Sequence, residues 1–319
     1  KFADIPLLSR MDAVAETFID EIETLLNRDL PEEERIPLIE KFRKMYGTMD
    51  FYVLYNRFLK KEGYQTLPRR PLEKRKLRYE DVYPVLYLKY RLSRQAERSN
   101  IKHLVIDEMQ DYSRLQYLII RRMFSCKMTI LGDRAQTMAD QQQDVLQFLP
   151  GIFGKDLRRI EMRKSYRNTV EIASYAANLI GVTDLELFER HGMPVLERDV
   201  TDLEAALREA VDTLFPDEKT YETAAVIVPD EKTAERAYLI LREILAEKDF
   251  DCEKRLSWLN RDSSSFKKGL TVTTFYLAKG LEFDQVFSIF PKDEKREMMM
   301  QAQYIAATRA LHELRVYHI

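Results

Sequence analysis

Two adjacent acids, Asp107 and Glu108, could together hold a metal ion and activate water. The apolar run 102–106 before them predicts a fully buried parallel strand that ends at these carboxylates. A second apolar run ends at Gly132 and Asp133. In open α/β sheets, ligands bind at the carboxyl ends of the strands. There, one carboxylate can hold Mg²⁺ while its neighbour orients or deprotonates water. For this segment alone, a strand that ends in a solvated Asp-Glu pair remains an alternative.

Further short motifs follow in order along the chain. After the acidic segment 107–111 and the Gly-Asp segment 132–136 come Lys-Ser-Tyr-Arg-Asn-Thr at 164–169, Thr-Thr-Phe-Tyr-Leu-Ala-Lys-Gly-Leu-Glu-Phe-Asp at 273–284 and Tyr-Ile-Ala-Ala-Thr-Arg-Ala at 304–310. In this order they resemble motifs II to VI of the UvrD/Rep-type superfamily 1 DNA helicases. The resemblance runs from residue 78 to the last residue. It implies an α/β fold with two RecA-like parallel-sheet lobes, the first one incomplete, and an N-terminal helical insertion.

The resemblance also implies ATP and Mg²⁺ as cofactors, with ATP between the two lobes, and it assigns roles to single residues. Asp107 would hold Mg²⁺ through water, and Glu108 would be the general base. Arginines of the second lobe would meet the charge that develops on the γ-phosphate, a task suited to the planar, permanently charged guanidinium. The implied catalytic residues are Glu108, Gln136, Arg167 and Arg309. The nucleotide would contact Tyr166 through its adenine and Glu282 through its ribose, and it would also lie against Gly280 and Asp107. The residues that would face nucleic acid are Thr273, Thr274 and Tyr276. For Lys279, Asp133 and Asp111, capping of loops or internal pairing is the alternative.

A phosphate-binding loop is missing from this sequence. No Gly-x4-Gly-Lys-Ser/Thr segment occurs, and the nearest approach, 151–156, has the wrong spacing and no metal-binding hydroxyl. Such a loop would cradle the phosphates with backbone N–H groups and reach them with its lysine. We therefore expect a fragment of a longer ATPase, inactive alone, whose Walker A segment belongs to the same polypeptide. A degenerate non-ATPase is the alternative.

Composition narrows the class of protein. The 319 residues suit two domains, and 45% hydrophobic with 33% charged residues is typical of a globular protein. A net charge of -2 gives no overall nucleic-acid signal, so any basic surface must be local. Cys126 and Cys252 form no CxxC pair, which argues against a disulfide framework or a cysteine zinc site and fits the cytoplasm. No apolar run reaches the length of a membrane span, so no membrane partner is expected.

Three domains are predicted: a helical insertion with a basic connector at 1–77, part of the first lobe at 78–155, and the second lobe at 156–319. Apolar spacing predicts three helices in the first 65 residues, with Asp12 as a possible cap. Downstream, strands are predicted at 157–162, 223–228, 269–275 and 285–290, and helices at 170–180 and 232–246. Strands that alternate with helices indicate a parallel sheet.

The stretch 69–98 is locally basic, with ten Lys/Arg against four Asp/Glu and interleaved tyrosines. Lysine and arginine pair with phosphates, and tyrosine can stack on bases. The candidate nucleic-acid contacts here are Arg69, Arg70, Lys74, Arg75 and Lys76. The alternative is a helix with core tyrosines and solvated basic residues, which the spacing of Tyr83 and Tyr87 fits well.

Two departures narrow the resemblance. The interval between the motifs at 164–169 and 273–284 is too short for the large helical subdomain of UvrD/Rep enzymes, and 137–143 lacks their base-stacking aromatics. Tyr276, where histidine is usual, and the run 79–90 resemble the HelD (helicase IV-like) branch, whose Gram-positive members act on RNA polymerase. Three functions therefore stay open: a DNA helicase or translocase, an ATPase that binds RNA polymerase and removes it from nucleic acid, and a non-catalytic interaction module.

Overall fold

A computed structural model describes the chain at residues 5, 7–48, 50–92, 100–133, 136, 144–162, 164–182, 186–215, 221–248, 250–263, 268–292 and 297–319. Its contacts divide the chain into two compact units. Unit 1 comprises Lys1–Gly132 and Gln143–Leu157, and unit 2 comprises Asp133–Gln142 and Arg158–Ile319. The sequence analysis assigned the whole Gly-Asp motif, residues 132–136, to the first lobe. The contacts within the structure instead group Asp133 and the residues after it with unit 2.

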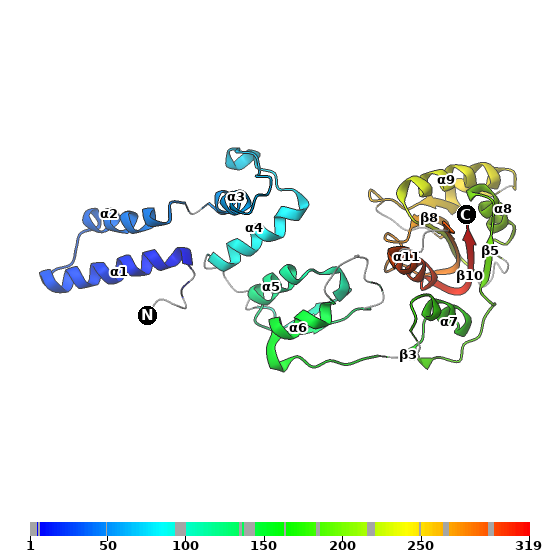
Figure 1. Cartoon of the computed structure of the whole chain (residues 1–319), viewed down its shortest axis with the longest axis horizontal. Coiled ribbons are helices and arrows are strands. Elements are labelled where there is room, and N and C mark those ends of the chain that lie inside the picture. Colours follow the sequence, from blue (N-terminus) through cyan, green and yellow to red (C-terminus); the bar gives the residue numbers. More distant parts are fainter. Residues whose placement is uncertain are drawn as a thin grey trace. The chain divides into compact units, whose positions relative to one another are not determined.

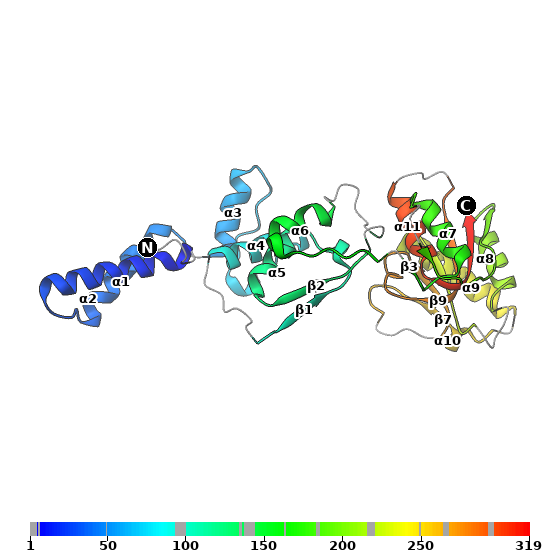
Figure 2. The same cartoon turned by 90° about the horizontal axis from the view of Figure 1, so that it is seen from below.

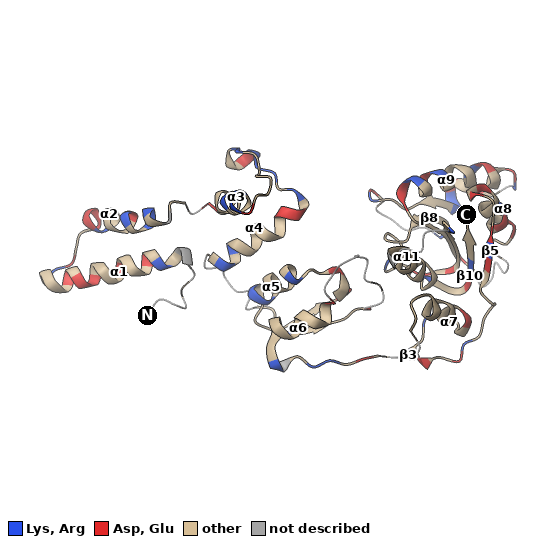
Figure 3. Ribbon diagram, viewed as in Figure 1, with Lys and Arg blue, Asp and Glu red and all other residues tan. Residues whose placement is uncertain are grey.

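The N-terminal part of unit 1 is helical, as predicted. Its helices are α1 (Leu7–Leu26), α2 (Glu32–Arg43), α3 (Phe51–Lys61) and α4 (Tyr79–Leu92), with short 3₁₀ turns at Lys44–Tyr46 and Leu72–Lys74. In Figure 3, α2 begins with acidic residues and ends with basic ones, which suits the helix dipole. The prediction of Asp12 as a cap is wrong, because α1 begins earlier and Asp12 instead pairs with Arg43 of α2 at 2.7 Å. No described helix is long and apolar enough to cross a membrane.

Helices α3 and α4 share a small core around a buried carboxylate. The Asp50 side chain caps α3, accepting from the backbone N–H groups of Tyr52 and Val53. Asp81 of α4 is 2% exposed and accepts hydrogen bonds from Tyr55 Oη (2.8 Å) and Arg78 Nε (2.6 Å). Burial alone would raise the pKa of Asp81, but these hydrogen bonds and the charge of Arg78 outweigh it, and the pKa is lowered. The same burial, with Asp81 next to it, raises the pKa of Tyr55 to about 12.

The rest of unit 1 is a two-stranded parallel sheet with helices on it (Figure 2). It contains β1 (His103–Ile106), β2 (Lys127–Ile130), α5 (Arg114–Met123) and α6 (Val145–Phe153), with 3₁₀ turns at Met109–Asp111 and Gly154–Asp156. Ile106 packs in a buried cluster with Tyr117 of α5 and Phe148 of α6. The prediction of a fully buried strand is wrong for β1, since Val105 is 61% exposed. Side chains alternate across a strand, and α5 and α6 cover the face opposite to Val105.

Unit 2 contains a six-stranded, entirely parallel sheet in the order β5-β10-β9-β6-β8-β7. Its elements are β3 (Lys164–Ser165), α7 (Val170–Leu179), β4 (Glu186–Leu187), β5 (Leu196–Asp199), α8 (Leu203–Asp212), β6 (Thr223–Val228), α9 (Glu231–Ala246), α10 (Cys252–Arg255), β7 (Leu256–Trp258), β8 (Gly269–Thr274), β9 (Phe283–Phe290), α11 (Glu297–Ala307) and β10 (Ala310–His318). The α/β prediction with parallel sheets is confirmed, and the observed β6, β8, β9, α7 and α9 lie where the sequence predicted strands and helices.

Helices cover both faces of this sheet (Figure 1). Alternate residues of β6 point to opposite sides: Val226 packs with α8 and α9, and Ile227 packs with α7 and α11. Side-chain caps start the covering helices, with Thr169 before α7, Asp202 before α8 and Asp230 before α9. Burial on both faces explains why the central strands are continuous apolar runs.

The predicted strand at 157–162 is wrong. None of these residues is in a strand, and the first strand of unit 2 begins at Lys164. Ile160 is 74% exposed and Met162 is 87% exposed. The alternation of apolar and polar residues resembled a strand, but no described strand pairs with this segment.

Candidate functional site

The acidic motif lies at the carboxyl edge of the sheet in unit 1. β1 and β2 pair in register, with Ile106 opposite Ile130. Leu131 then donates its N–H to Ile106 O (2.8 Å), and its carbonyl accepts from Met109 N (2.8 Å). The acidic motif and Gly132 therefore lie together at one sheet edge.

Glu108 has an unusual backbone conformation. Its φ of 52° and ψ of 51° are left-handed, which costs a residue other than glycine about 1–2 kcal/mol. Neighbouring groups hold it there: Asp107 Oδ1 accepts from Glu108 N (2.8 Å), and the Gln110 amide donates to Glu108 Oε2 (2.5 Å). Strain of this kind persists where the surroundings fix it, and it clusters at functional sites.

Gly132 packs directly on the acidic motif. A Cβ at this position would lie 2.5 Å from Gln110 Oε1, 2.5 Å from Met109 Cγ and 2.6 Å from Met109 N. Only glycine allows this approach of the two backbones. Gln110 itself is 2% exposed. Sequence reasoning did not single out Gln110, although an amide two residues after a candidate base was a usable signal.

Asp107, for which the sequence predicted contact with Mg²⁺, lies directly after β1. Its side chain is exposed at the strand end, beside Glu108. Within the described residues, no group of three or more His, Cys, Asp or Glu is arranged to bind a metal ion. Magnesium in nucleotide sites commonly takes one or two carboxylates, with phosphates and water completing its shell. A single exposed carboxylate at this edge therefore fits that ion.

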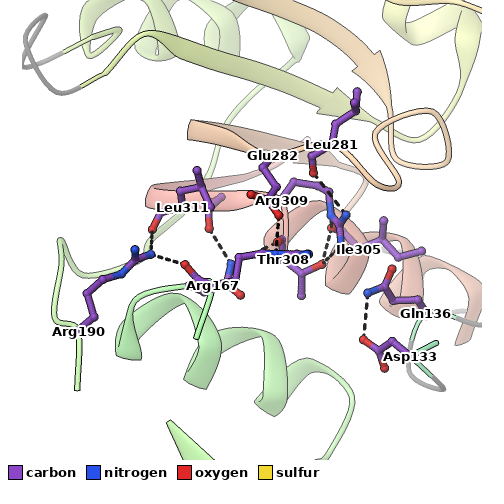
Figure 4. Close-up of polar contacts among 12 residues, drawn as sticks. Asp133, Gln136, Arg167, Arg190, Leu281, Glu282, Ile305, Thr308, Arg309 and Leu311 are labelled. Atoms are coloured by element: carbon purple, nitrogen blue, oxygen red, sulfur yellow. Dashed lines mark hydrogen bonds and ion pairs between the residues drawn. The ribbon is translucent and has the colours of Figure 1, made fainter. Parts of the chain in front are cut away.

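In unit 2, Arg167 and Glu282 form an ion pair with each other (Figure 4). Arg167 Nε lies 2.7 Å from Glu282 Oε1, and the two side chains are 46% and 43% exposed. The adjacent Tyr166 is 61% exposed, and its ring centroid lies 5.6 Å from that of Phe188. Lys164 Nζ lies 5.5 Å from the Tyr166 centroid. An accessible ring next to an arginine and a carboxylate is compatible with the predicted contacts to a nucleotide.

Arg309 is held inside unit 2. The side chain is 1% exposed and donates to Ile305 O (3.2 Å), Leu281 O (3.4 Å) and Thr308 Oγ1 (3.1 Å). Figure 4 shows these contacts from α11 and the loop before β9. To reach a phosphate, as the sequence predicted, the Arg309 guanidinium would have to leave these acceptors.

Two residues that sequence reasoning missed connect the motif at 164–169 to the start of β10. Asn168, 7% exposed, donates through Nδ2 to Thr308 O (3.2 Å) and Ala310 O (2.7 Å), on both sides of Arg309. Arg190 donates to the carbonyl of Arg167 and to Leu311 O. These long-range contacts fix the backbones of both candidate arginines, and no local sequence pattern reveals them.

Gln136 is buried in unit 2, with 7% exposure. Its amide nitrogen donates to Asp133 Oδ2 (3.0 Å), which also accepts from Tyr304 Oη (3.1 Å), while Lys279 Nζ lies 3.5 Å from Gln136 O. Burial, and then the Asp133 charge, raise the pKa of Tyr304. The side-chain oxygen Oε1 of Gln136 has no hydrogen-bond partner among the described residues. Buried polar atoms normally have one, so a ligand could satisfy this oxygen.

The candidate nucleic-acid residues of β8 are not at the surface. Thr273 and Thr274 are both 0% exposed, and Thr273 Oγ1 donates to Leu259 O (3.3 Å). Neither hydroxyl can touch nucleic acid in this structure, because β8 lies between β6 and β7 with both faces covered. Tyr276 is half-buried after the strand. Gly280 has a φ of +82°, which accounts for glycine in this loop.

In the basic connector, Arg75 differs from its neighbours. Its Nη1 pairs with Asp50 Oδ2 at 2.7 Å, and its guanidinium lies 4.7 Å from the Tyr52 ring centroid. This places Arg75 among structural contacts. Figure 3 shows basic residues between α3 and α4, and four of the predicted nucleic-acid contacts there are exposed, namely Arg69, Arg70, Lys74 and Lys76.

A protein-family model matches part of the chain. Residues 11–138 match the model of the UvrD/REP helicase N-terminal domain, so this segment is similar in sequence to that domain. No curated protein matches the chain significantly.

Solved helicase structures are similar at low identity. The C-terminal domain of a possible DNA helicase from Lactobacillus plantarum WCFS1 is 24% identical, with 49% of this chain and 88% of that domain covered and a TM-score of 0.38. The PRRSV helicase is 17% identical over 68% of this chain and 35% of its own, with a TM-score of 0.38. Arterivirus nonstructural protein 10 (helicase), in complex with DNA, is 14% identical over 70% and 40%, with a TM-score of 0.36. Because these TM-scores are low, the structural similarities carry no argument about the function of this chain.

Proposed function

We propose that this chain is the motor portion of a UvrD-like superfamily 1 DNA helicase or translocase, which couples ATP hydrolysis to movement on nucleic acid. The observation that carries the proposal is Glu108, a carboxylate at the carboxyl edge of a parallel strand. Its left-handed backbone is fixed by Asp107, and its side chain by Gln110. The match of residues 11–138 to a UvrD/REP helicase domain supports the same function. The proposed location is the cytoplasm.

Each residue has a stated task in this proposal. Bound ATP with Mg²⁺ would supply the phosphoryl group and neutralise part of its charge. Asp107 would hold the Mg²⁺ ion, and Glu108 would accept the proton of the attacking water. Tyr166 stacks on the base, and Arg167 exchanges Glu282 for phosphate oxygens. Since Glu282 is then released from Arg167, it can accept hydrogen bonds from the ribose.

The test is the ATPase activity of the full-length polypeptide that contains this chain, with and without single-stranded DNA. Glu108→Gln should lower kcat by about 100-fold or more, the scale of general acid–base catalysis. Glu253→Gln, the same change at an exposed position of α10, is the matched control and should leave kcat unchanged. An active Glu108→Gln enzyme would remove Glu108 as the base and with it the proposal.

The isolated 319-residue chain should hydrolyse ATP negligibly, because the sequence contains no phosphate-binding loop. Turnover by purified chain that survives Glu108→Gln would indicate a contaminating ATPase. Turnover that the substitution abolishes would show that the chain needs no such loop.

A HelD-like ATPase that binds RNA polymerase and removes it from nucleic acid is the second candidate. Segment 137–143 contains no aromatic residue, and base stacking is worth about 1–3 kcal/mol per base. We therefore expect weak, salt-sensitive binding of single-stranded DNA by this chain, carried by the exposed basic connector. Tight binding at physiological salt would favour the helicase, whereas co-purification with RNA polymerase and little DNA stimulation would favour the HelD-like ATPase. A full-length protein without a phosphate-binding loop would instead be a non-catalytic interaction module.

A further inference from the structure

Gln110 is a buried amide whose two ends face different motifs. Its side-chain oxygen lies against Gly132, at 2.5 Å from the position that a Cβ would take. Its nitrogen donates to Glu108 Oε2 at 2.5 Å. An ionised carboxylate can only accept hydrogen bonds, so the NH₂ end of the amide must face Glu108. The orientation of Gln110 therefore follows from its neighbours.

The turn that carries Gln110 is hydrogen-bonded to its surroundings. Gln110 belongs to the 3₁₀ turn Met109–Asp111, and both backbone polar groups of Met109 have partners outside the turn. Met109 N donates to Leu131 O (2.8 Å), and Met109 O accepts from the hydroxyl of Tyr117 (3.0 Å), a residue with no exposed surface. A hydrogen bond to a charged acceptor is shorter and stronger than one between neutral groups. Gln110 can therefore set the position of the Glu108 carboxylate.

We propose that Gln110 is the positioning residue for the candidate base Glu108, and that Gly132 keeps the space that its amide needs. This inference rests on the proposed ATPase function, in which Glu108 accepts the proton of water. Gln110 contributes by fixing one carboxylate oxygen, so that the carboxylate does not have to be ordered during the reaction. Gly132 belongs to the Gly-Asp motif, and it contacts the side chain of Gln110, which in turn contacts Glu108.

The experiment is a double-mutant cycle in the full-length ATPase. Gln110→Met keeps an unbranched side chain of similar size and removes the donor. It should lower kcat by about 10–100-fold, part of the 10²–10⁴-fold that a placed base contributes, with KM for ATP within about two-fold. In a Glu108→Gln background, measured by single turnover, Gln110→Met should cause no further loss, because residues that act through one group are not additive. A full further loss there, or an unchanged kcat in the single variant, would overturn the inference.

A second variant covers a failure of Gln110→Met to fold. Gln110→Glu is isosteric and places a second carboxylate beside Glu108. It removes the donor and repels the Glu108 carboxylate, so kcat should fall at least as far as in Gln110→Met, again with KM for ATP within about two-fold. A merely structural role would not produce this split between kcat and KM, and an unchanged kcat in Gln110→Glu counts against Gln110. Full activity of Glu108→Gln would instead defeat the proposed function, so the two failures are distinguishable.

Discussion

Gly132→Ala is the most direct test of how the two motifs of unit 1 pack. The added methyl group would lie within 2.6 Å of the Met109 backbone nitrogen and 2.5 Å of Gln110 Oε1. Met109 N cannot move away freely, because it donates to Leu131 O at 2.8 Å. Gly132 has no positive φ, so the expected effect comes from crowding and not from backbone conformation.

The magnitude follows from two contributions. Overpacking a tight site costs about 1–3 kcal/mol, and loss of the Met109–Leu131 hydrogen bond adds about 0.5–1.5 kcal/mol. The free energy of unfolding of unit 1 should therefore fall by about 2–4 kcal/mol. Urea unfolding followed by circular dichroism should show a lower midpoint at an unchanged slope.

Gly151→Ala is the matched control. Gly151 lies in α6 of the same unit, with no positive φ and no atom within 4 Å of an added Cβ. Alanine there should raise the free energy of unfolding by about 0.5–1 kcal/mol, because it reduces the entropy of the unfolded chain and favours the helix. If Gly132→Ala were as stable as Gly151→Ala, the close packing of Gly132 on Gln110 would be refuted.

Three further predictions concern other parts of the chain. Tyr55→Phe should cost about 1–3 kcal/mol, since buried Asp81 loses a donor. The pKa of Tyr55 in the folded protein is raised to about 12, so the Tyr55 hydroxyl should stabilise the fold fully below about pH 10. This stabilisation should be lost as the pH rises toward 12. Urea unfolding at pH 9 to 12 should show this loss in the wild type and not in Tyr55→Phe. Arg309→Met should destabilise unit 2 by about 1–3 kcal/mol, because buried acceptors lose their donor. Arg167→Met should change the stability by less than about 1 kcal/mol, since its ion pair is half exposed. Thermal unfolding of the two variants measures this difference. Neutralising the four exposed basic residues of 69–76 should reduce the salt dependence of DNA binding in a fluorescence titration, since each lost phosphate contact lowers the slope of log K against log salt by roughly one.

Local patterns predicted much of the secondary structure. The spacing of apolar residues was sufficient for α1 and α3, because each of these helices buries one stripe. It also located α2, although none of the residues of α2 is buried. The strands β6, β8 and β9 were equally visible, since both of their faces are covered and the runs are continuously apolar. For β1 the same reasoning failed: its run is as apolar, but one face carries exposed Val105. Apolar composition does not report how many layers cover a sheet.

The candidate site was less accessible to sequence reasoning. Motif residues could be placed at a sheet edge, but the direction of an arginine or threonine side chain depends on which acceptors the folded chain brings next to it. Arg309 turns to carbonyls of its own unit, and Thr273 points into the core around β8. Asn168 and Arg190, which hold the backbones around both candidate arginines, make contacts across more than a hundred residues of sequence. Long-range hydrogen bonds of this kind leave no periodic signal.

In this structure, several groups proposed to face the nucleotide are already engaged by the chain itself. Glu108 accepts from Gln110, Arg167 pairs with Glu282, and Arg309 donates to backbone carbonyls. For the two arginines, nucleotide binding would therefore be an exchange of partners, and its free energy would be the difference between the new contacts and the old ones. The half-exposed Arg167 gives up little on leaving Glu282, whereas buried Arg309 must vacate several acceptors. Arg167 should accordingly bind phosphate first. Arg309 should bind phosphate only when its new contacts are more favourable than the hydrogen bonds to backbone carbonyls that it gives up.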